Sequence, residues 1–155
     1  MLRLTLLDWG MTEAELIKLC IQKRTTILPK RLTEPGPTLA QIKTLLEAAT
    51  AAPDHQQIHP WRFVALSASS RDELARVFEL DLIRRDGLCT AEQRALARDK
   101  AYRSPLLWLA VVRVRDEHKE IPEQERLVSL GCALQNILLS ATAMGYGSCL
   151  TTGQA

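Results

Sequence analysis

Cationic and hydroxyl side chains stand together in the segment QKRTT, Gln22–Thr26. Lys23 and Arg24 can bind a phosphate group, lysine as a point charge and arginine through its planar fork, and Thr25 can add a hydroxyl group. The same residues also suit the exposed C-terminal end of a helix, where cations interact favourably with the helix dipole. The residue types alone leave both interpretations open.

A second polar stretch, AAPDHQQIHPWRF (51–63), connects an expected helix to an expected strand. His55 and His59 are four residues apart, a spacing that could hold a metal ion if the segment were helical. Pro53 and Pro60 flank the pair and argue against a regular helix, and no third ligand is evident. We therefore expect no metal site. The segment is either one wall of a pocket for a planar ligand or a turn with exposed polar residues.

A third stretch, AMGYGSCLTTG (143–153), contains two closely spaced glycines. Gly145 and Gly147 allow the backbone to approach a ligand or another element closely. A dinucleotide fingerprint would follow a strand and open a helix, whereas these glycines end a helix and precede a strand. The Rossmann interpretation is therefore rejected, and a helix C-cap followed by a tight turn accounts for at least one of the two glycines.

The composition is that of an ordinary soluble domain. The chain has 155 residues, of which 46% are hydrophobic and 25% are charged, with a formal net charge of +2. This balance gives no reason to expect nucleic acid or an acidic membrane as a partner. No apolar run is long enough to span a membrane, and the N-terminal segment lacks a signal-peptide cleavage site. We expect one cytoplasmic domain over residues 1–155.

The four cysteines, Cys20, Cys89, Cys132 and Cys149, are widely separated. None belongs to a C-x-x-C pair, which argues against a zinc ribbon or a redox dithiol. They are most simply free thiols in a reducing compartment.

Helix-start signals predict five helices around these segments. Thr12, Thr38 and Thr90 each precede a Glu or Gln by three residues, which is the pattern of a capping box. Ser70 and Pro122 indicate two further starts. The expected helices run over about 13–23 and 38–52, then from 70, from 90, and from 122 to a stop at Gly145.

Strand signals are fewer than helix signals. Trp61–Leu66 is short and rich in aromatic and aliphatic residues, Leu106–Val114 is an almost unbroken apolar run, and Gly147–Thr152 is a third candidate. A continuous apolar run is typical of a strand that is covered on both faces. Helices should therefore cover a small central sheet.

Taken together, these segments resemble the flavin-dependent nitroreductase family, and most closely its compact bacterial NAD(P)H nitroreductases. The matching motifs occur in the family's order over nearly the whole chain. They are KRT at 23–25, EPGPT at 34–38, APDH at 52–55, PWRF at 60–63, GCA at 131–133 and GYG at 145–147.

The resemblance implies an α+β fold with a central mixed β-sheet covered by helices. It also implies a homodimer with FMN at the subunit interface, NAD(P)H as the electron donor and a nitroaromatic, quinone or similar acceptor. By position, the cofactor-binding residues would be Lys23, Arg24, Thr25, His55, Gln57, Leu150, Thr151 and Thr152, and the NAD(P)-binding segment would be Ser140, Ala141, Thr142, Ala143, Met144 and Gly145. No catalytic side chain is expected, because the flavin carries the chemistry.

The sequence departs from the family pattern at several points. Thr25 replaces the usual serine and keeps the hydroxyl, whereas Lys23 replaces an arginine and loses the planar fork. Residues 1–11 extend the N-terminus, and the family's C-terminal region has no counterpart, so the domain is expected to be truncated. The alternatives are an FMN-binding protein without turnover, an inactive truncated homologue, or a helical interaction domain without a cofactor.

Overall fold

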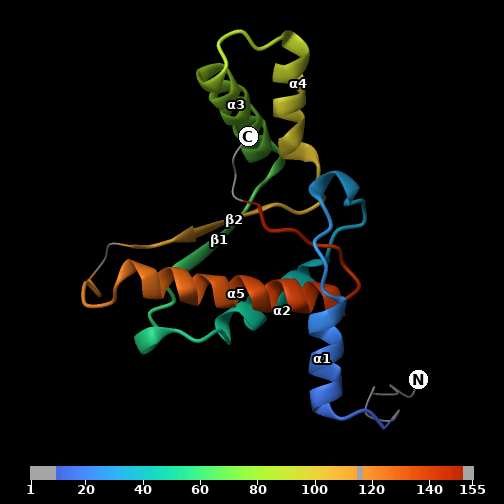
Figure 1. Cartoon of the computed structure of the whole chain (residues 1–155), viewed down its shortest axis with the longest axis vertical. Helices are drawn as coiled ribbons and strands as arrows, with labels where there is room; N and C mark the ends of the chain where they lie inside the picture. The colour runs from blue at the N-terminus through green and yellow to red at the C-terminus, as the bar shows by residue number, and fades with distance from the viewer. Residues whose placement is uncertain (1–9, 115–116, 152–155) are drawn as a thin grey trace.

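The computed structural model describes residues 10–114 and 117–151. The expected N-terminal extension lies mostly outside this range, as does Thr152. The described elements, in chain order, are α1 (Glu13–Lys23), η2 (Pro29–Arg31), α2 (Leu39–Thr50), η3 (His55–Gln57), β1 (Trp61–Ala65), α3 (Ala68–Arg85), α4 (Ala91–Asp99), η4 (Lys100–Tyr102), β2 (Trp108–Val112) and α5 (Glu123–Ala143). The expected α+β class is confirmed, with helices dominating (Figure 1).

Capping residues begin the helices much as the sequence predicts. Thr12, Thr38 and Thr90 each form a complete capping box with the residue three positions later. The third helix is the exception, because it begins at Ala68 and its N-cap is Ser67, which accepts the Ser70 N–H at 3.2 Å. The predicted start at Ser70 was therefore one turn too late: both serines are suitable caps, and the earlier one takes the role.

The core lies between α2 and α5, which run antiparallel. Leu45 and Ala49 on α2 pack with Ala133, Ile137 and Ala141 on α5, and all five side chains are buried. Three of the five are alanines, so the two helices can approach each other closely. This packed pair forms the framework on which the rest of the molecule is built.

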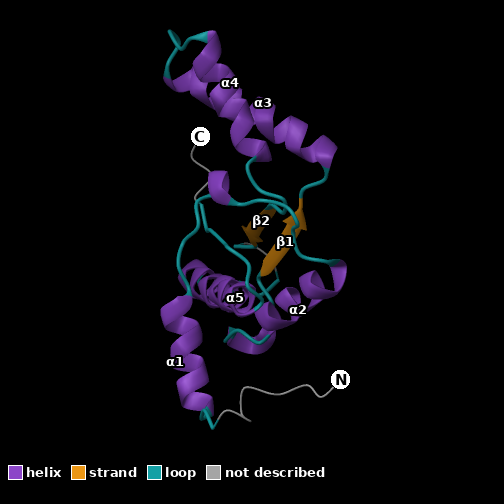
Figure 2. Ribbon diagram, turned by 90° about the vertical axis from the view of Figure 1, so that its right-hand side faces the viewer, coloured by secondary structure: helices purple, strands orange, loops and turns teal. Residues whose placement is uncertain are grey.

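The sheet has two antiparallel strands, with Trp61 opposite Val112 and Ala65 opposite Trp108. Phe63 and Trp108 are in ring contact at 6.0 Å and pack against the α2–α5 core. Figure 2 shows the strands between this helical layer and the α3–α4 hairpin. The expected third strand is reduced, in the described part of the chain, to one parallel bridge between Thr26 and Ser148.

The α3–α4 hairpin projects away from the rest of the molecule (Figure 1). Its base is fixed by Arg71, whose guanidinium donates to the carbonyls of Ser104 at 2.6 Å and Pro105 at 2.8 Å. Tyr102 donates a short hydrogen bond to Asp72, which raises the pKa of the tyrosine hydroxyl. These bonds join the start of α3 to the segment after α4. Among the described helices, none is both long and apolar enough to cross a bilayer.

Candidate functional site

The end of α1 lies beside the chain that follows α5. The bridge between Thr26 and Ser148 is accompanied by a hydrogen bond from the Ile27 N–H to the Ser148 carbonyl at 3.0 Å. Gly147 makes this approach possible, because a Cβ at that position would lie 3.2 Å from the Cβ of Ile27. The segment after Lys23 is therefore fixed against the glycine-rich turn by backbone contacts.

This glycine-rich turn ends α5 in a Schellman motif. The Tyr146 N–H donates to the Ala141 carbonyl at 2.9 Å, and the Gly145 N–H donates to the Thr142 carbonyl at 3.0 Å. Gly145 has a φ of 85°, a left-handed conformation that glycine adopts without steric cost. The predicted C-cap is thus confirmed for Gly145, and Gly147 serves the close approach instead.

An open surface cavity of about 320 Å³, called the small cavity below, lies between these two segments and is lined by Lys23, Thr25, Ile27, Thr142, Gly145, Tyr146 and Gly147. Lys23 is exposed, and within the described residues its ammonium group has no hydrogen bond or ion pair. A free ammonium group and a hydroxyl in one small cavity are donors that suit a phosphate group or a polyol. Arg24 is half-buried next to this cavity but does not line it.

A larger cavity of about 460 Å³ lies under the α3–α4 hairpin. Its two cations, Arg71 and Arg103, are already engaged: Arg71 with backbone carbonyls, and Arg103 with Asp99 at 3.1 Å. The smaller cavity is therefore the better candidate for an anionic ligand, because its cation, Lys23, has no partner in the described part of the chain.

The polar loop after α2 lines neither of these two cavities. Nδ1 of His55 is 2.6 Å from Oε2 of Glu125, in the first turn of α5. Gln57 and His59 have positive φ angles of 57° and 44°, which L-residues rarely adopt. The ring of His59 packs edge-on against Trp61, so the two histidines of the loop have different partners.

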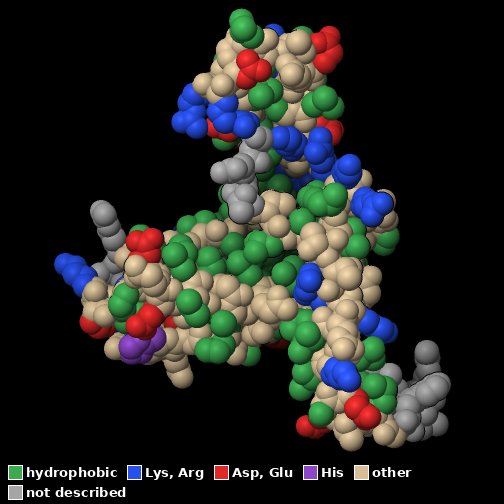
Figure 3. Space-filling view, in the orientation of Figure 1, with side chains coloured by type: hydrophobic (Ala, Val, Ile, Leu, Met, Phe, Trp, Pro, Cys, Tyr) green, Lys and Arg blue, Asp and Glu red, His purple; other side chains and the backbone are tan. Residues whose placement is uncertain are grey.

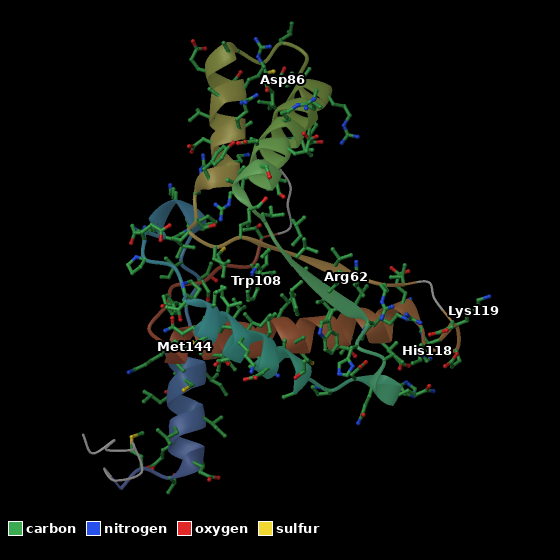
Figure 4. All side chains as sticks on the ribbon, turned by 180° about the vertical axis from the view of Figure 1, so that it is seen from behind. Arg62, Asp86, Trp108, His118, Lys119 and Met144 are labelled. Atoms are coloured by element: carbon green, nitrogen blue, oxygen red, sulfur yellow. The ribbon has the colours of Figure 1, made fainter. Side chains whose placement is uncertain are left out.

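The two predicted parts of the site lie at opposite ends of α5. Lys23 and Thr25 are beside Thr142, whereas His55 is beside Glu125, and a helix rises about 26 Å between those two positions. Figure 4 marks both ends, with His118 and Lys119 just before the helix and Met144 at its C-cap. Within a single protomer, the two groups of predicted residues are therefore separated by most of the length of α5.

The remaining predicted residues are spread around the C-terminal end of α5. Thr142 and Gly145 line the small cavity, whereas Ala141 is buried in the core. Leu150 and Thr151 are exposed beyond the glycine turn, and Thr152 lies outside the described residues. Part of the proposed NAD(P) segment therefore shares a cavity with the proposed phosphate anchors.

Sequence reasoning missed three residues at these two places. Glu125 is seventy positions from its partner His55, and no sequence spacing signals such a contact. Tyr146 lines the small cavity, and its hydroxyl donates to Gln41 at 3.0 Å. Ile27 contacts Gly147, and only the requirement for a glycine at that position hints at a close neighbour.

Comparison with known proteins identifies the family. The sequence profile of the Nitroreductase family matches residues 21–154, which include both ends of α5 and the segment at Lys23–Thr25. The chain belongs to the nitroreductase family. It is 31% identical over 139 residues to the "Putative NAD(P)H nitroreductase YdjA" of Escherichia coli K12, an alignment that covers 88% of this chain and 72% of YdjA. The expected relationship to this oxidoreductase family is thereby confirmed.

Solved structures of the family have the same fold. A BluB-like flavoprotein from Clostridium difficile superposes with a TM-score of 0.64 at 22% identity, covering 88% of this chain and 74% of the other. The FMN-dependent nitroreductase NfnB from Mycobacterium smegmatis, in complex with NADPH, superposes with a TM-score of 0.62 at 17% identity, covering 89% and 75%. At these identities the likeness confirms the nitroreductase fold of this chain.

Proposed function

We propose that this chain is an FMN-dependent oxidoreductase that takes electrons from NAD(P)H and passes them to a nitroaromatic, a quinone or a similar small acceptor. The observation that carries the proposal is the small cavity at the end of α5, where Lys23, which has no partner among the described residues, and Thr25 present a cation and a hydroxyl. The family relationship supports it, because YdjA bears the name of an NAD(P)H nitroreductase and NfnB is described as FMN-dependent.

The residues present suit FMN by the chemistry of their donors. Lys23 and Thr25 would hold the phosphate and the ribityl chain, with Arg24 beside them. His55, Gln57, Leu150 and Thr151 would border the ring system. When bound, FMN supplies the hydride-transfer chemistry, while the protein contributes binding, orientation and electrostatics.

A homodimer is part of the proposal, because the two groups of site residues are too far apart in one protomer. A second copy could bring its His55 loop to the Lys23 end of the first. The chain exposes 11188 Å² of surface, whereas a compact monomer of its length exposes about 7,900 Å². Such an excess is expected of a protomer that is completed by a partner.

An apolar face is available for that partner. Leu127 and Val128 on α5 are 46% and 67% exposed, and Leu109 and Val111 on β2 are also exposed. Figure 3 shows hydrophobic side chains gathered over the central region where α5 and the sheet lie. Apolar patches of this kind are typical of protein–protein interfaces.

The proposal places residues 1–155 in one domain and the protein in the cytoplasm. The four cysteines are free, and free thiols suit a reducing compartment.

The deciding experiment is the visible spectrum of the purified protein, as isolated and after reconstitution with FMN, followed by NAD(P)H oxidation with a nitroaromatic or a quinone added. We expect a yellow protein whose NAD(P)H consumption depends on the acceptor. A yellow protein without turnover would support a flavin-binding role instead. A protein that stays colourless after reconstitution would overturn the proposal.

A further inference from the structure

His55 is joined to α5 by one short side-chain contact. Its Nδ1 lies 2.6 Å from Oε2 of Glu125, although the two residues are seventy positions apart. The side chains are 56% and 49% exposed, and ion pairs with that exposure add little to stability. The main consequence of the contact is therefore the orientation of the His55 ring.

The backbone of the loop is held independently of this contact. The carboxylate of Asp54 accepts the His59 N–H at 2.6 Å, and the Gln57 N–H donates to the Asp54 carbonyl at 3.1 Å. These bonds hold a loop whose positive φ angles need support from their surroundings. Within the described residues, Glu125 is the one partner of the His55 side chain.

The contact determines which ring nitrogen carries the proton when the imidazole is neutral. An ionised carboxylate can only accept a hydrogen bond, so the proton on Nδ1 faces Glu125. Nε2 is then the nitrogen left for a ligand. A carboxylate behind a histidine is known to set both the tautomer and the ring orientation where histidines bind metal ions, and the same physics applies here.

We propose that Glu125 is a positioning residue, which holds His55 in the Nδ1–H tautomer so that Nε2 is the atom offered to the flavin. This inference rests on the proposed function, because it assumes that the His55 loop borders FMN. Two other carboxylates lie close in sequence to this pair. Asp54, next to His55, accepts the His59 N–H, and Glu123, two residues before Glu125 in the first turn of α5, has no partner among the described residues.

The first test uses the full-length protein without cofactor. Nitrogen NMR of ¹⁵N-histidine-labelled protein at alkaline pH, where imidazole is neutral, reports the tautomer, and His55→Gln assigns the signal. We expect the Nδ1–H form in the wild type and a shift to the Nε2–H form, which free histidine favours, in Glu125→Ala. Glu123→Ala is the matched control and should leave the tautomer unchanged. An unaltered tautomer in Glu125→Ala would overturn the proposal.

The second test measures FMN affinity by quenching of flavin fluorescence. Glu125→Ala should weaken binding about tenfold relative to Glu123→Ala. Adding His55→Gln to Glu125→Ala should weaken it little further, because the two residues act as one unit. Glu125→Gln, which keeps the shape of the side chain, should recover part of the loss.

The outcomes separate this inference from the proposed function. If the wild type binds FMN and Glu125→Ala binds it equally well, the positioning role is wrong while the proposed function stands. If the wild type binds no FMN, the proposed function fails together with the flavin half of this inference. The NMR measurement still decides whether Glu125 sets the tautomer of His55.

Discussion

Gly147 lies directly against Leu32 and Ile27: a Cβ built at Gly147 would be 3.0 Å from Cδ2 of Leu32 and 3.2 Å from Cβ of Ile27. Gly147→Ala should therefore push apart the two segments that form the small cavity. We expect a loss of about 1–3 kcal/mol in the free energy of unfolding, measured by urea denaturation, because overpacking a close contact costs that much. Gly87→Ala is the control, since nothing lies within 4 Å of a Cβ there. Equal stabilities of the two variants would contradict the close approach.

The cations at the end of α1 should decide cofactor affinity. Replacing Lys23 and Arg24 together with alanine should weaken FMN binding about ten- to a hundredfold, because charge-assisted hydrogen bonds to phosphate are lost. Lys18→Ala removes one positive charge from an exposed position earlier on the helix and should change affinity little. Fluorescence titration of the cofactor-free protein measures both. An affinity that survives the double replacement would argue against the phosphate assignment.

Three helix starts could be predicted from the sequence because a capping box depends only on residues three positions apart. A threonine and the Glu or Gln three positions later can bond to each other's backbone only in one geometry, and Thr12, Thr38 and Thr90 all adopt it. The segment 147–152 shows the opposite case. It has strand-forming residues, but a strand needs a partner along its length, and the described part of the chain provides only Thr26.

The sequence indicated which residues to consider for the candidate site, but it did not indicate how they are arranged in space. Lys23 and Thr25 lie together because they are close in sequence, and the family resemblance suggested both as cofactor-binding residues. The contact between His55 and Glu125 depends on the antiparallel packing of α2 on α5. No spacing in the sequence encodes that packing, so the separation of the site into two ends became visible only in the structure.

Arg126 should be among the residues most important for stability. Its side chain is 1% exposed, and its guanidinium donates to the carbonyls of Ile121, Arg113 and His118. Arg126→Met fills similar space but removes the donor from three carbonyls, of which that of Ile121 is buried and the other two are partly buried, so we expect a loss of about 3 kcal/mol in urea denaturation. Arg126→Lys should recover only part of it, because lysine lacks the planar fork. A loss below about 1 kcal/mol would show that water replaces these bonds.

The N-terminus of α1 should weaken in acid. The backbone N–H and hydroxyl of Thr12 bond to the carboxylate of Glu15 and lower its pKa. A carboxylate with a lowered pKa stabilises the folded state above its unfolded-state pKa, and that contribution is lost as the pH falls through the lowered value. Protection of the α1 amides against hydrogen exchange should therefore fall in acid. Glu15→Gln should remove this pH dependence, whereas Glu13→Gln should keep it.

Gly131 offers a test of the homodimer that does not depend on the cofactor. It lies in the middle of α5, is exposed, and has nothing within 4 Å of a built Cβ. In an isolated protomer, Gly131→Ala should stabilise the helix by about 0.5–1 kcal/mol, since glycine is unfavourable in a helix interior.

If a second copy packs against this face of α5, the added methyl group should instead obstruct the close approach of the two helices and weaken the dimer. Sedimentation equilibrium and the concentration dependence of Tm distinguish the two results. We expect Gly131→Ala to dissociate at a higher concentration than the wild type. A stabilised variant with unchanged association would place the interface elsewhere.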